Sequence, residues 1–355
     1  MEDRILMKGN DAVAQGAIDA GCRYYFGYPI TPQTEISHYM AEHLPRAGGV
    51  FIQAESEIAA INMVYGASSA GARSMTSSSS PGISLKQEGL SYIAGAELPA
   101  VVVNVVRCGP GLGGILPAQC DYFQSVKGGG HGDYRNIVLA PNSVQEIYDL
   151  TREAFDLADK YRITVMVMAD GSLGQMMESV TLKQNKPPLE FQKPWATTGT
   201  GMKRPQNVVT SVYIIPEELE EVNNRLQAKY REIEKNEVRW EEINCQDAKL
   251  IVCSYGTTSR IMINVIQQAK QEGIEVGLIR PITLWPFPYD VLEKYTDTAE
   301  AFLSLELSAG QMVEDVKLGT KFKRPVHFYG RTGGMIPTQG EILKEIRRIL
   351  GKGGE

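Results

Sequence analysis

The chain alternates between short apolar runs and segments with helix-like periodicity. The apolar runs recur at intervals of roughly 25 to 35 residues, a rhythm typical of parallel α/β proteins. Helix-like patterns fill most of the gaps between them. We expect the strands of a first sheet at residues 23–27, 50–53, 73–77, 100–106, 136–140 and 163–169.

Capping signals predict where the helices begin and end. Short polar side chains accept hydrogen bonds from the free N–H groups of a first turn, and glycine ends a helix in a left-handed conformation. The start signals are Asn10, Thr31 with Pro32 in the first turn, Ser56, and a capping box from Ser143 to Glu146. The expected stops are Gly21 and Gly71.

A second, smaller α/β unit follows a connector rich in Pro, Thr, Gly and Lys. Because the connector begins at Lys186, we expect a first domain at residues 1–185, a linker at 186–246 and a second domain at 247–355. The second unit is expected to have strands at 249–254, 276–280, 301–306 and 326–329, and helices at 261–271 and 339–350.

The linker contains a charged segment, residues 216–242, whose apolar positions are spaced by three or four. These positions form one helical stripe: Leu219, Val222, Leu226, Tyr230 and Ile233. The stripe favours a bridging helix that lies on the protein surface. A helix that docks a regulatory partner is the alternative.

Composition indicates a globular protein and excludes several function classes. The 355 residues are 43% hydrophobic, enough for two or three domains without disulfide or metal supports. A net charge of −6 offers no broad attraction to nucleic acid or to anionic membranes. Without a signal-peptide pattern or an apolar run long enough to cross a bilayer, the chain is expected to be cytoplasmic. Five cysteines that include no C-x-x-C pair predict no iron–sulfur or zinc site.

Candidate chemistry gathers where three predicted strands end. Ligands of parallel sheets bind beyond the carboxyl ends of the strands. Tyr28 and Thr31 follow the first strand, Glu57 follows the second and Arg107 follows the fourth. If these strands are neighbours, a hydroxyl, a carboxylate and a guanidinium meet at one edge.

Each of these three residues also has a purely structural interpretation. Thr31 would cap the helix that begins near Pro32, and Glu57 would be a first-turn acid favoured by the helix dipole. Arg107 would be a surface arginine at a strand end.

The glycine-rich run from Gly109 to Gly114 satisfies G-x-G-x-x-G and must be tested as a dinucleotide site. It fails on context, because Ile115-Leu116-Pro117 opens no helix and the run follows a late strand. A G-x-x-x-x-G-K-[ST] phosphate loop is absent from the sequence.

Two further features have both a chemical and a structural interpretation. Cys108 could be a thiol nucleophile with His131 as its base, although a buried, inert cysteine is the commoner state. The serines at 77–80, ahead of Pro81-Gly82, could form a turn that holds an oxyanion or a solvated loop.

The combination of motifs closely resembles the alpha chain of the 2-oxoacid:ferredoxin oxidoreductases. The resemblance covers nearly the whole chain and is carried by Tyr-Pro-Ile-Thr-Pro at 28–32, Glu-Ser-Glu at 55–57, the 76–82 turn, and Glu97-Leu-Pro running into Arg107. It implies a doubly wound parallel-sheet domain of the thiamine-diphosphate-binding, pyrimidine type. A smaller α/β domain like the C-terminal domain of transketolase is expected to follow.

The same resemblance implies roles for individual residues. Glu57 matches the glutamate that hydrogen-bonds the aminopyrimidine ring, where a carboxylate favours the imino tautomer that can take the thiazolium proton. Thr31 and Arg107 match the residues that hold the substrate carboxylate, with Tyr28 beside them, since an arginine fork fits a planar carboxylate. Pro29 and Ile30, from the same signature, are expected to contact the cofactor.

The chain lacks the other half of such a site. The family's Gly-Asp-Gly motif with a following Asn holds magnesium and diphosphate, whereas the only Asp-Gly here, Asp170-Gly171, follows Ala169 and has no suitably spaced Asn. We therefore expect thiamine diphosphate to be shared with a beta subunit that carries the magnesium ion. A 4Fe–4S cluster is also expected on partner chains, with gamma and ferredoxin-like delta subunits, external ferredoxin and coenzyme A as further partners.

The expected reaction is the oxidative decarboxylation of a 2-oxoacid to its acyl-CoA with reduction of ferredoxin, in anaerobic metabolism. The segment from Arg107 to Tyr134 resembles branched-chain, 2-oxoisovalerate members, whereas a second cation would suit 2-oxoglutarate, and Lys127 and His131 leave that choice open. A nicotinamide-dependent dehydrogenase and a non-catalytic scaffold subunit are the alternatives from other classes.

Overall fold

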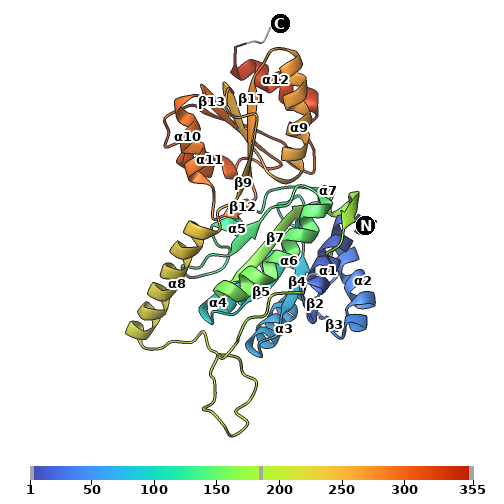
Figure 1. Ribbon diagram of the computed structural model, residues 1–355, viewed down its shortest axis with the longest axis vertical. Helices are drawn as coiled ribbons and strands as arrows, with labels where there is room; N and C mark the ends of the chain where they lie inside the picture. Colours follow the sequence, from blue (N-terminus) through green and yellow to red (C-terminus); the bar gives the residue numbers. More distant parts are fainter. Residues whose placement is uncertain (1–3, 184–186, 352–355) are drawn as a thin grey trace.

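Two β-sheets, each covered by helices, stack along the long axis of the molecule (Figure 1). A computed structural model describes residues 4–183 and 187–351 of the chain. Within these ranges none of the helices is both long and apolar enough to cross a membrane. The expected α/β class is confirmed.

The larger sheet has seven strands in the order β12-β6-β7-β5-β4-β2-β3, and all except β12 run parallel. Its parallel strands are β2 (Tyr24–Gly27), β3 (Val50–Gln53), β4 (Ser74–Ser78), β5 (Ala100–Val106), β6 (Ile137–Leu139) and β7 (Thr164–Asp170). Each lies within one residue of the range predicted from the apolar runs. Continuous apolar runs suit this sheet because helices bury both of its faces.

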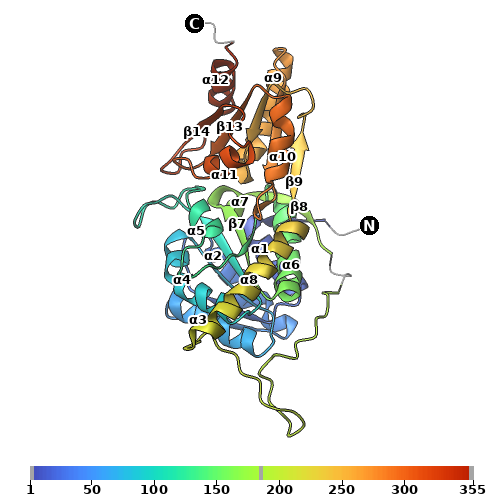
Figure 2. The ribbon, with the colours of Figure 1, turned by 90° about the vertical axis from the view of Figure 1, so that its left-hand side faces the viewer.

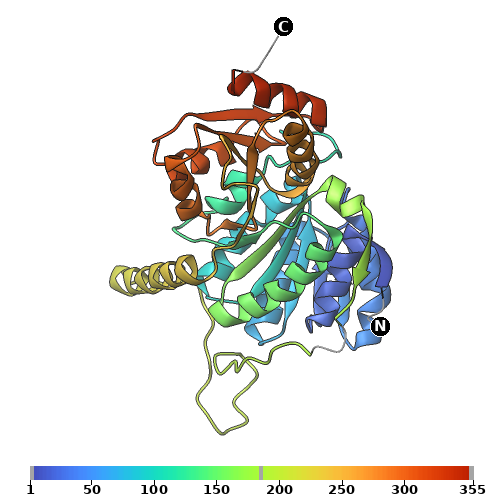
Figure 3. The same ribbon diagram turned by 45° about the horizontal axis from the view of Figure 1, so that its top comes forward.

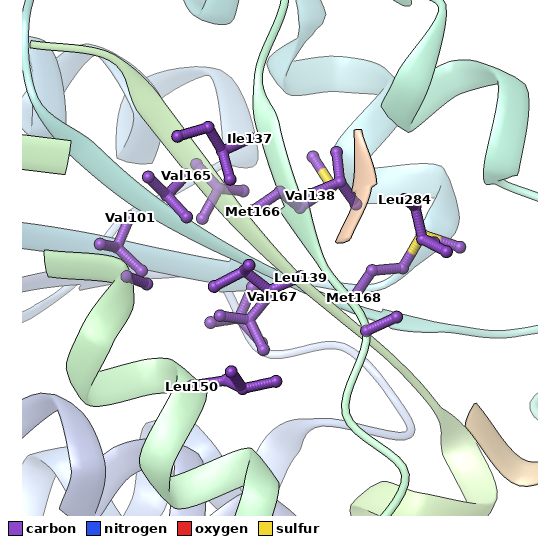
Figure 4. Close-up of a cluster of buried hydrophobic side chains, with 14 of the residues drawn as sticks. Val101, Ile137, Val138, Leu139, Leu150, Val165, Met166, Val167, Met168 and Leu284 are labelled. Carbon is purple, nitrogen blue, oxygen red and sulfur yellow. The ribbon is translucent and has the colours of Figure 1, made fainter. Parts of the chain in front are cut away.

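Helices cover both faces of the larger sheet (Figure 1). One face carries α1 (Gly9–Asp19), α2 (Thr34–His43) and α6 (Val144–Tyr161), and the other carries α3 (Glu57–Ser69) and α4 (Ser80–Gly95). Two short helices, α5 (Tyr122–Val126) and α7 (Gly171–Gln175), follow β5 and β7. The core between the layers is densely apolar where β5, β6 and β7 meet α6 (Figure 4).

A strand from far along the chain completes this sheet. β12 (Thr283–Trp285) pairs antiparallel with β6, and Leu284 packs beside Val138 and Met168 (Figure 4). Sequence periodicity did not predict β12, because three residues are too few to show a period. A two-stranded sheet of β1 (Arg4–Lys8) and β8 (Met177–Thr181) was also missed.

The predicted capping signals are confirmed in part. Oγ of Ser56 accepts a hydrogen bond from the backbone N–H of Ala59, and Oγ of Ser143 accepts one from that of Glu146. The Glu146 carboxylate turns back to the N–H of Asn142 rather than to that of Ser143, so the predicted box is not fully reciprocal. The two predicted stops, Gly21 and Gly71, both have positive φ.

Two predicted helix caps are wrong. Asn10 lies inside α1, fully buried, and its side-chain amide donates to the carbonyl of Pro32 at 2.8 Å. Thr31 lies in a turn, and α2 begins only at Thr34. Both residues belong instead to tertiary contacts around one loop.

The smaller sheet has the order β14-β13-β10-β11-β9, with β9 antiparallel to its neighbour. Its strands are β9 (Trp240–Ile243), β10 (Leu250–Cys253), β11 (Val276–Pro281), β13 (Ala301–Glu306) and β14 (Val326–Gly330). Its helices are α9 (Gly256–Gln271), α10 (Tyr289–Lys294), α11 (Met312–Gly319) and α12 (Gln339–Ile349). The four predicted strands are confirmed, whereas α9 begins five residues before the predicted helix.

The charged segment forms α8 (Pro216–Asn236), which crosses the larger unit diagonally (Figure 2). Four positions of the predicted stripe are buried, from Val222 to Ile233, while Leu219 is 41% exposed. Lys229 and Arg225 of α8 both pair with Glu97 at the end of α4, and in Figure 3 the first turns of the helix project away from the body. The helix stops before the predicted residue 242, because Trp240 begins β9.

Buried polar contacts join the two units. Thr257 donates its hydroxyl hydrogen to Asp170 at 2.8 Å, and the Tyr122 hydroxyl donates to Asp315 at 2.8 Å. Gln119 bridges the same junction by donating to the carbonyl of Tyr255. The smaller unit therefore holds the loops at the carboxyl edge of the larger sheet in place.

Candidate functional site

Three sequence-predicted residues converge at the carboxyl edge of the larger sheet. Strands β3, β2, β4 and β5 are consecutive and parallel, so the segments after them emerge side by side. The guanidinium of Arg107, after β5, donates from Nη1 to the carbonyl of Thr31, after β2, at 2.9 Å. The predicted convergence of these two segments is therefore observed directly.

A buried polar network fixes the loop that carries Thr31. The Pro32 carbonyl accepts from Asn10 at 2.8 Å and from Gln175 at 3.1 Å. Beneath the loop, Ser77 donates to Gln33 at 2.5 Å and shares a 2.6 Å hydrogen bond with the Tyr25 hydroxyl. Four elements, namely α1, α7, β2 and β4, thus hold this loop.

The outer face of the same loop is open. Tyr28, Pro29 and Thr31 are exposed, and Ile30 is partly buried. The Thr31 side chain is available to a ligand, since it is the backbone carbonyl that holds Arg107.

Arg107 is a buried arginine, which excludes the surface-arginine interpretation. It is 7% exposed, donates from Nη2 to the carbonyl of Leu112 at 3.1 Å, and leaves Nε without a partner. Within the described ranges no carboxylate pairs with its guanidinium, so its charge is unneutralised. A buried cation in this state calls for an anion.

Glu57 begins α3 and is 5% exposed. Its carboxylate lies against the first turn of α4, where a Cβ atom at Gly82 would be 2.5 Å from Oε1 of Glu57 and 2.0 Å from Oγ of Ser78. Among the described residues no side chain or N–H donates to this carboxylate. A carboxylate that is nearly buried and accepts no hydrogen bond is more than a first-turn acid, because it has lost most of its solvent without gaining a partner.

The first turn of α4 lies between Glu57 and Arg107. Ser80 accepts a hydrogen bond from the backbone N–H of Arg107 and donates one to its carbonyl, both at 3.1 Å, while Gly82 contacts Glu57. The solvated-loop interpretation of the serines at 77–80 is wrong: Ser77 and Ser78 end β4, and Ser77, Ser78 and Ser79 are fully buried.

The glycine-rich segment folds back on itself as a loop. Arg107 pairs with Pro117 in an antiparallel bridge, Cys108 donates its N–H to Leu116, and Gly114 donates to Cys108. Because no helix opens at the third glycine, the segment lacks the strand–turn–helix of a dinucleotide site. Cys108 is buried, whereas His131 is exposed with its ring against Tyr92, so the proposed thiol–histidine pair does not form.

A cavity of about 600 Å³ separates this loop from the smaller unit. Its lining includes Ser80, Cys108, Asp121, Leu307 and Gly333. Burial raises the pKa of the Asp121 carboxyl, which accepts from Asn104 at 2.9 Å. Burial and nearby Asp121 also raise the pKa of the Cys120 thiol, on the same wall, to about 11.

Lys127 and His131, the two side chains that could bind a second carboxylate of the substrate, do not line this cavity. Lys127 donates to Asp315 at 2.6 Å and is thereby neutralised, and no lysine or arginine of the described residues lines the cavity. His131 faces outward on the 127–134 loop.

Asp170 is not free to bind a metal or diphosphate. It is 3% exposed, accepts from the N–H groups of Ser172, Leu173 and Thr257, and also receives the Thr257 hydroxyl. In the part of the chain that the structure describes, no group of His, Cys, Asp and Glu could hold a metal ion.

Sequence reasoning named Gly82 only as part of a turn and did not name Lys86 at all. They are four residues apart on α4, so helical spacing places both on the face that meets α3. That spacing was the signal available before the structure.

Two family models match the chain. The model described as "Pyruvate flavodoxin/ferredoxin oxidoreductase, thiamine diP-bdg" matches residues 15–242, and "Pyruvate:ferredoxin oxidoreductase core domain II" matches residues 248–342.

Curated relatives match over the full length. Ketoisovalerate oxidoreductase subunit VorB of Methanothermobacter marburgensis is 51% identical, and the match covers 99% of each chain. 2-Oxoglutarate synthase subunit KorA of Methanocaldococcus jannaschii is 38% identical over 96% of this chain and 98% of its own.

Solved structures share the fold. The 2-oxoglutarate:ferredoxin oxidoreductase of Magnetococcus marinus, solved with 2-oxoglutarate, coenzyme A and succinyl-CoA bound, matches with a TM-score of 0.87 at 29% identity. That match covers 98% of this chain and 65% of the solved one. An inactive β4 tetramer of a split-gene transketolase matches with a TM-score of 0.59 at 10% identity, a likeness of fold alone.

Proposed function

The chain belongs to the 2-oxoacid:ferredoxin oxidoreductases, which are thiamine-diphosphate-dependent enzymes, and from this premise we propose that it holds the aminopyrimidine half of the cofactor and the carboxylate of a 2-oxoacid. One observation carries the proposal: the unpaired carboxylate of Glu57 lies against the first turn of α4, and Ser80 of the same turn hydrogen-bonds the backbone of Arg107, whose guanidinium is unneutralised. Such a pair suits a ring that donates a hydrogen bond and a substrate that carries a negative charge.

The residues present fit the ring half of thiamine diphosphate. The glycine at 82 leaves room beside Oε1 of Glu57 that a methyl group would fill, and the loop with Tyr28, Pro29 and Ile30 offers an open face for contact. When bound, the cofactor would supply the carbon nucleophile that adds to the ketone.

Each residue then has a defined task. Glu57 accepts a hydrogen bond from the ring nitrogen and holds a proton there. Arg107, fixed by the carbonyls of Thr31 and Leu112, directs its remaining N–H groups to the substrate carboxylate. The Thr31 hydroxyl supplies a second hydrogen bond, and Tyr28 covers one side of the substrate. Together these contacts fix the position of the ketone carbon.

The diphosphate half of the cofactor must come from a partner. Asp170 is fully occupied within the fold, and the described residues provide no metal cluster. Exposed apolar side chains surround the site, among them Ile58, Leu85, Leu112 and Ile115, and they suit a protein interface.

The relatives are named as subunits, so the family works as multi-subunit complexes. We propose a beta subunit with the magnesium and diphosphate site, 4Fe–4S clusters on partner chains, gamma and ferredoxin-like delta subunits, and electron transfer to ferredoxin. Coenzyme A is the proposed acyl acceptor. We also propose a cytoplasmic location and domain boundaries at residues 185 and 246.

A branched-chain 2-oxoacid, 2-oxoisovalerate, is the proposed substrate. The 51% identical relative is named a ketoisovalerate oxidoreductase subunit. The pairing of Lys127 with Asp315 removes the cation that a second carboxylate, as in 2-oxoglutarate, would need.

The test is a substrate panel on the purified complex of this chain with its partner subunits. Reduction of a viologen dye is followed with 2-oxoisovalerate, 2-oxoglutarate or pyruvate, each with and without coenzyme A. We expect kcat/KM for 2-oxoisovalerate to exceed that for 2-oxoglutarate by about tenfold or more. The second carboxylate of 2-oxoglutarate would be buried without a partner, which is costly. A preference for 2-oxoglutarate overturns the substrate, and failure with all three acids overturns the function.

A further inference from the structure

Ser78, the last residue of β4, is fully buried, and its hydroxyl oxygen forms no hydrogen bond with any described residue. A buried hydroxyl group without a partner is unfavourable for folding, and alanine would fill nearly the same space without that cost. Folding alone therefore does not account for a serine at this position. The hydroxyl group calls for an acceptor that lies close to it.

Ser78 and Glu57 meet at Gly82, in the first turn of α4. The position that a Cβ atom of residue 82 would occupy lies 2.0 Å from Oγ of Ser78 and 2.5 Å from Oε1 of Glu57. Because residue 82 is glycine, no side chain at this position separates the two oxygen atoms. The hydroxyl group has a hydrogen to donate, and the carboxylate accepts none from a side chain or N–H group of the described residues. The two groups are therefore complementary neighbours.

The serines on either side of Ser78 position the other two segments of the site. Ser77 donates to Gln33, in the loop after β2, at 2.5 Å. Ser80 hydrogen-bonds the backbone N–H and the carbonyl of Arg107, both at 3.1 Å. Successive side chains of a strand point to opposite faces of the sheet, so Ser78 lies on the face opposite to Ser77, where α3 begins.

We propose that Ser78 is a positioning residue that donates its hydroxyl hydrogen to the Glu57 carboxylate and so holds it in place for the aminopyrimidine ring. The inference rests on the proposed function, since it acts through the same carboxylate. Both oxygens of a carboxylate can accept hydrogen bonds, so donation by Ser78 leaves acceptor capacity for the ring. A carboxylate that is held in the binding geometry loses less freedom when the ring binds, which strengthens binding.

The test compares two cofactors on the assembled complex by calorimetry at saturating magnesium. One is thiamine diphosphate, and the other is its analogue in which CH replaces the ring nitrogen that binds Glu57. Ser78→Ala should weaken the binding of thiamine diphosphate by about tenfold, through loss of one hydrogen bond to a carboxylate. The affinity of the analogue should stay unchanged, because the analogue forms no hydrogen bond with Glu57. Ser78→Cys, whose thiol is a weak donor, should give an intermediate affinity for thiamine diphosphate.

Thr76→Val is the matched control. Thr76 lies two residues earlier on the same face of β4, is fully buried, and has a hydroxyl group that also lacks a partner among the described residues. This variant should bind both cofactors as the wild type does. In urea denaturation of the full chain without cofactor, Ser78→Ala should be at least as stable as the wild type, because it removes an unpartnered hydroxyl group.

The inference is overturned if Ser78→Ala keeps the wild-type affinity for thiamine diphosphate. It is also overturned if Ser78→Ala weakens the binding of both cofactors equally, since the serine would then act on the fold. Should Ser78→Ala fail to fold, Ser78→Cys is judged by the same comparison. A wild-type complex that binds the two cofactors equally well, or binds neither, overturns the proposed function instead.

Discussion

The guanidinium of Arg107 donates a hydrogen bond to the backbone carbonyl of Thr31, 76 positions earlier in the sequence, at 2.9 Å. This contact ties the end of β5 to the loop after β2 across the intervening strand β4. Because the Thr31 carbonyl holds the arginine, the threonine hydroxyl and the remaining N–H groups of Arg107 stay free. The two residues can therefore act on one ligand.

Substitution of Arg107 should weaken substrate binding more than turnover. Lysine cannot reproduce the fork, so Arg107→Lys is expected to raise KM for the 2-oxoacid by about tenfold or more, the loss of one charge-assisted pair. Thr31→Ala keeps the carbonyl and should raise KM by a smaller factor. Steady-state kinetics of both variants would check this.

Arg135→Lys provides the control for Arg107→Lys. Arg135 also donates to backbone carbonyls, those of Lys127 and Tyr134, but it lies outside the site. Its KM should match the wild type. An unchanged KM in Arg107→Lys would exclude the assigned role.

Gly82 is expected to tolerate no side chain. The Cβ atom of alanine would lie 2.0 Å from Oγ of Ser78 and 2.5 Å from Oε1 of Glu57, so Gly82→Ala must displace the carboxylate. We expect about 1–3 kcal/mol of destabilisation and a clear loss of cofactor affinity. Denaturant unfolding and calorimetry would measure the two effects.

Gly66→Ala is the matched control, because an added Cβ there meets no atom within 4 Å. Gly66 lies within α3, so alanine should stabilise the chain by about 0.5–1 kcal/mol and leave cofactor affinity unchanged. If Gly82→Ala also stabilises the chain and leaves cofactor affinity unchanged, α4 does not pack closely against Glu57.

The sequence predicted most of this architecture because both of its main signals are local. Apolar runs and glycine stops depend on neighbouring residues, and the apolar runs located every strand of the two larger sheets except β9 and β12 to within one residue. Thr31, Glu57 and Arg107 could be placed at one edge because parallel strands share the direction of their carboxyl ends.

What the sequence could not provide was the set of long-range contacts. Asn10 appeared to be a helix cap, but its amide is committed to the Pro32 carbonyl on another loop. β12 pairs with β6, which lies more than 140 positions earlier, and no local pattern records such pairing. The burial of Lys86 likewise depends on how α3 and α4 pack.

Lys86→Met should increase stability, because Lys86 is fully buried and forms no ion pair with a described residue. Removal of a buried, unpaired ammonium is expected to raise the free energy of unfolding near pH 7 by about 1–3 kcal/mol. Since the wild-type pKa is about 8 when folded and the ordinary value is 10.5, unfolding takes up a proton between these values. Wild-type stability therefore rises with pH in this window, and the advantage of the variant should shrink there.

Urea denaturation of both proteins near pH 7 and near pH 9.5 would check this prediction. A variant that is less stable than the wild type near pH 7 would show that the ammonium contributes favourably to folding.

Asp170 should prove to be structural. Asn in its place would point an N–H₂ group at N–H donors, so Asp170→Asn is expected to destabilise the chain by about 2–4 kcal/mol. Thermal unfolding of the wild-type chain without partners should not shift when magnesium is added. A rise in Tm with magnesium would contradict the assignment of the metal site to a partner.

The central claim is that Glu57 binds the aminopyrimidine ring, and it is tested most directly by thiamine diphosphate affinity. The assembled complex is compared with its Glu57→Gln counterpart by calorimetry at saturating magnesium, with circular dichroism to confirm folding. Loss of the charge-assisted hydrogen bond is expected to weaken binding by about tenfold or more and to abolish most turnover. Equal affinity and equal turnover in the two complexes would contradict the account.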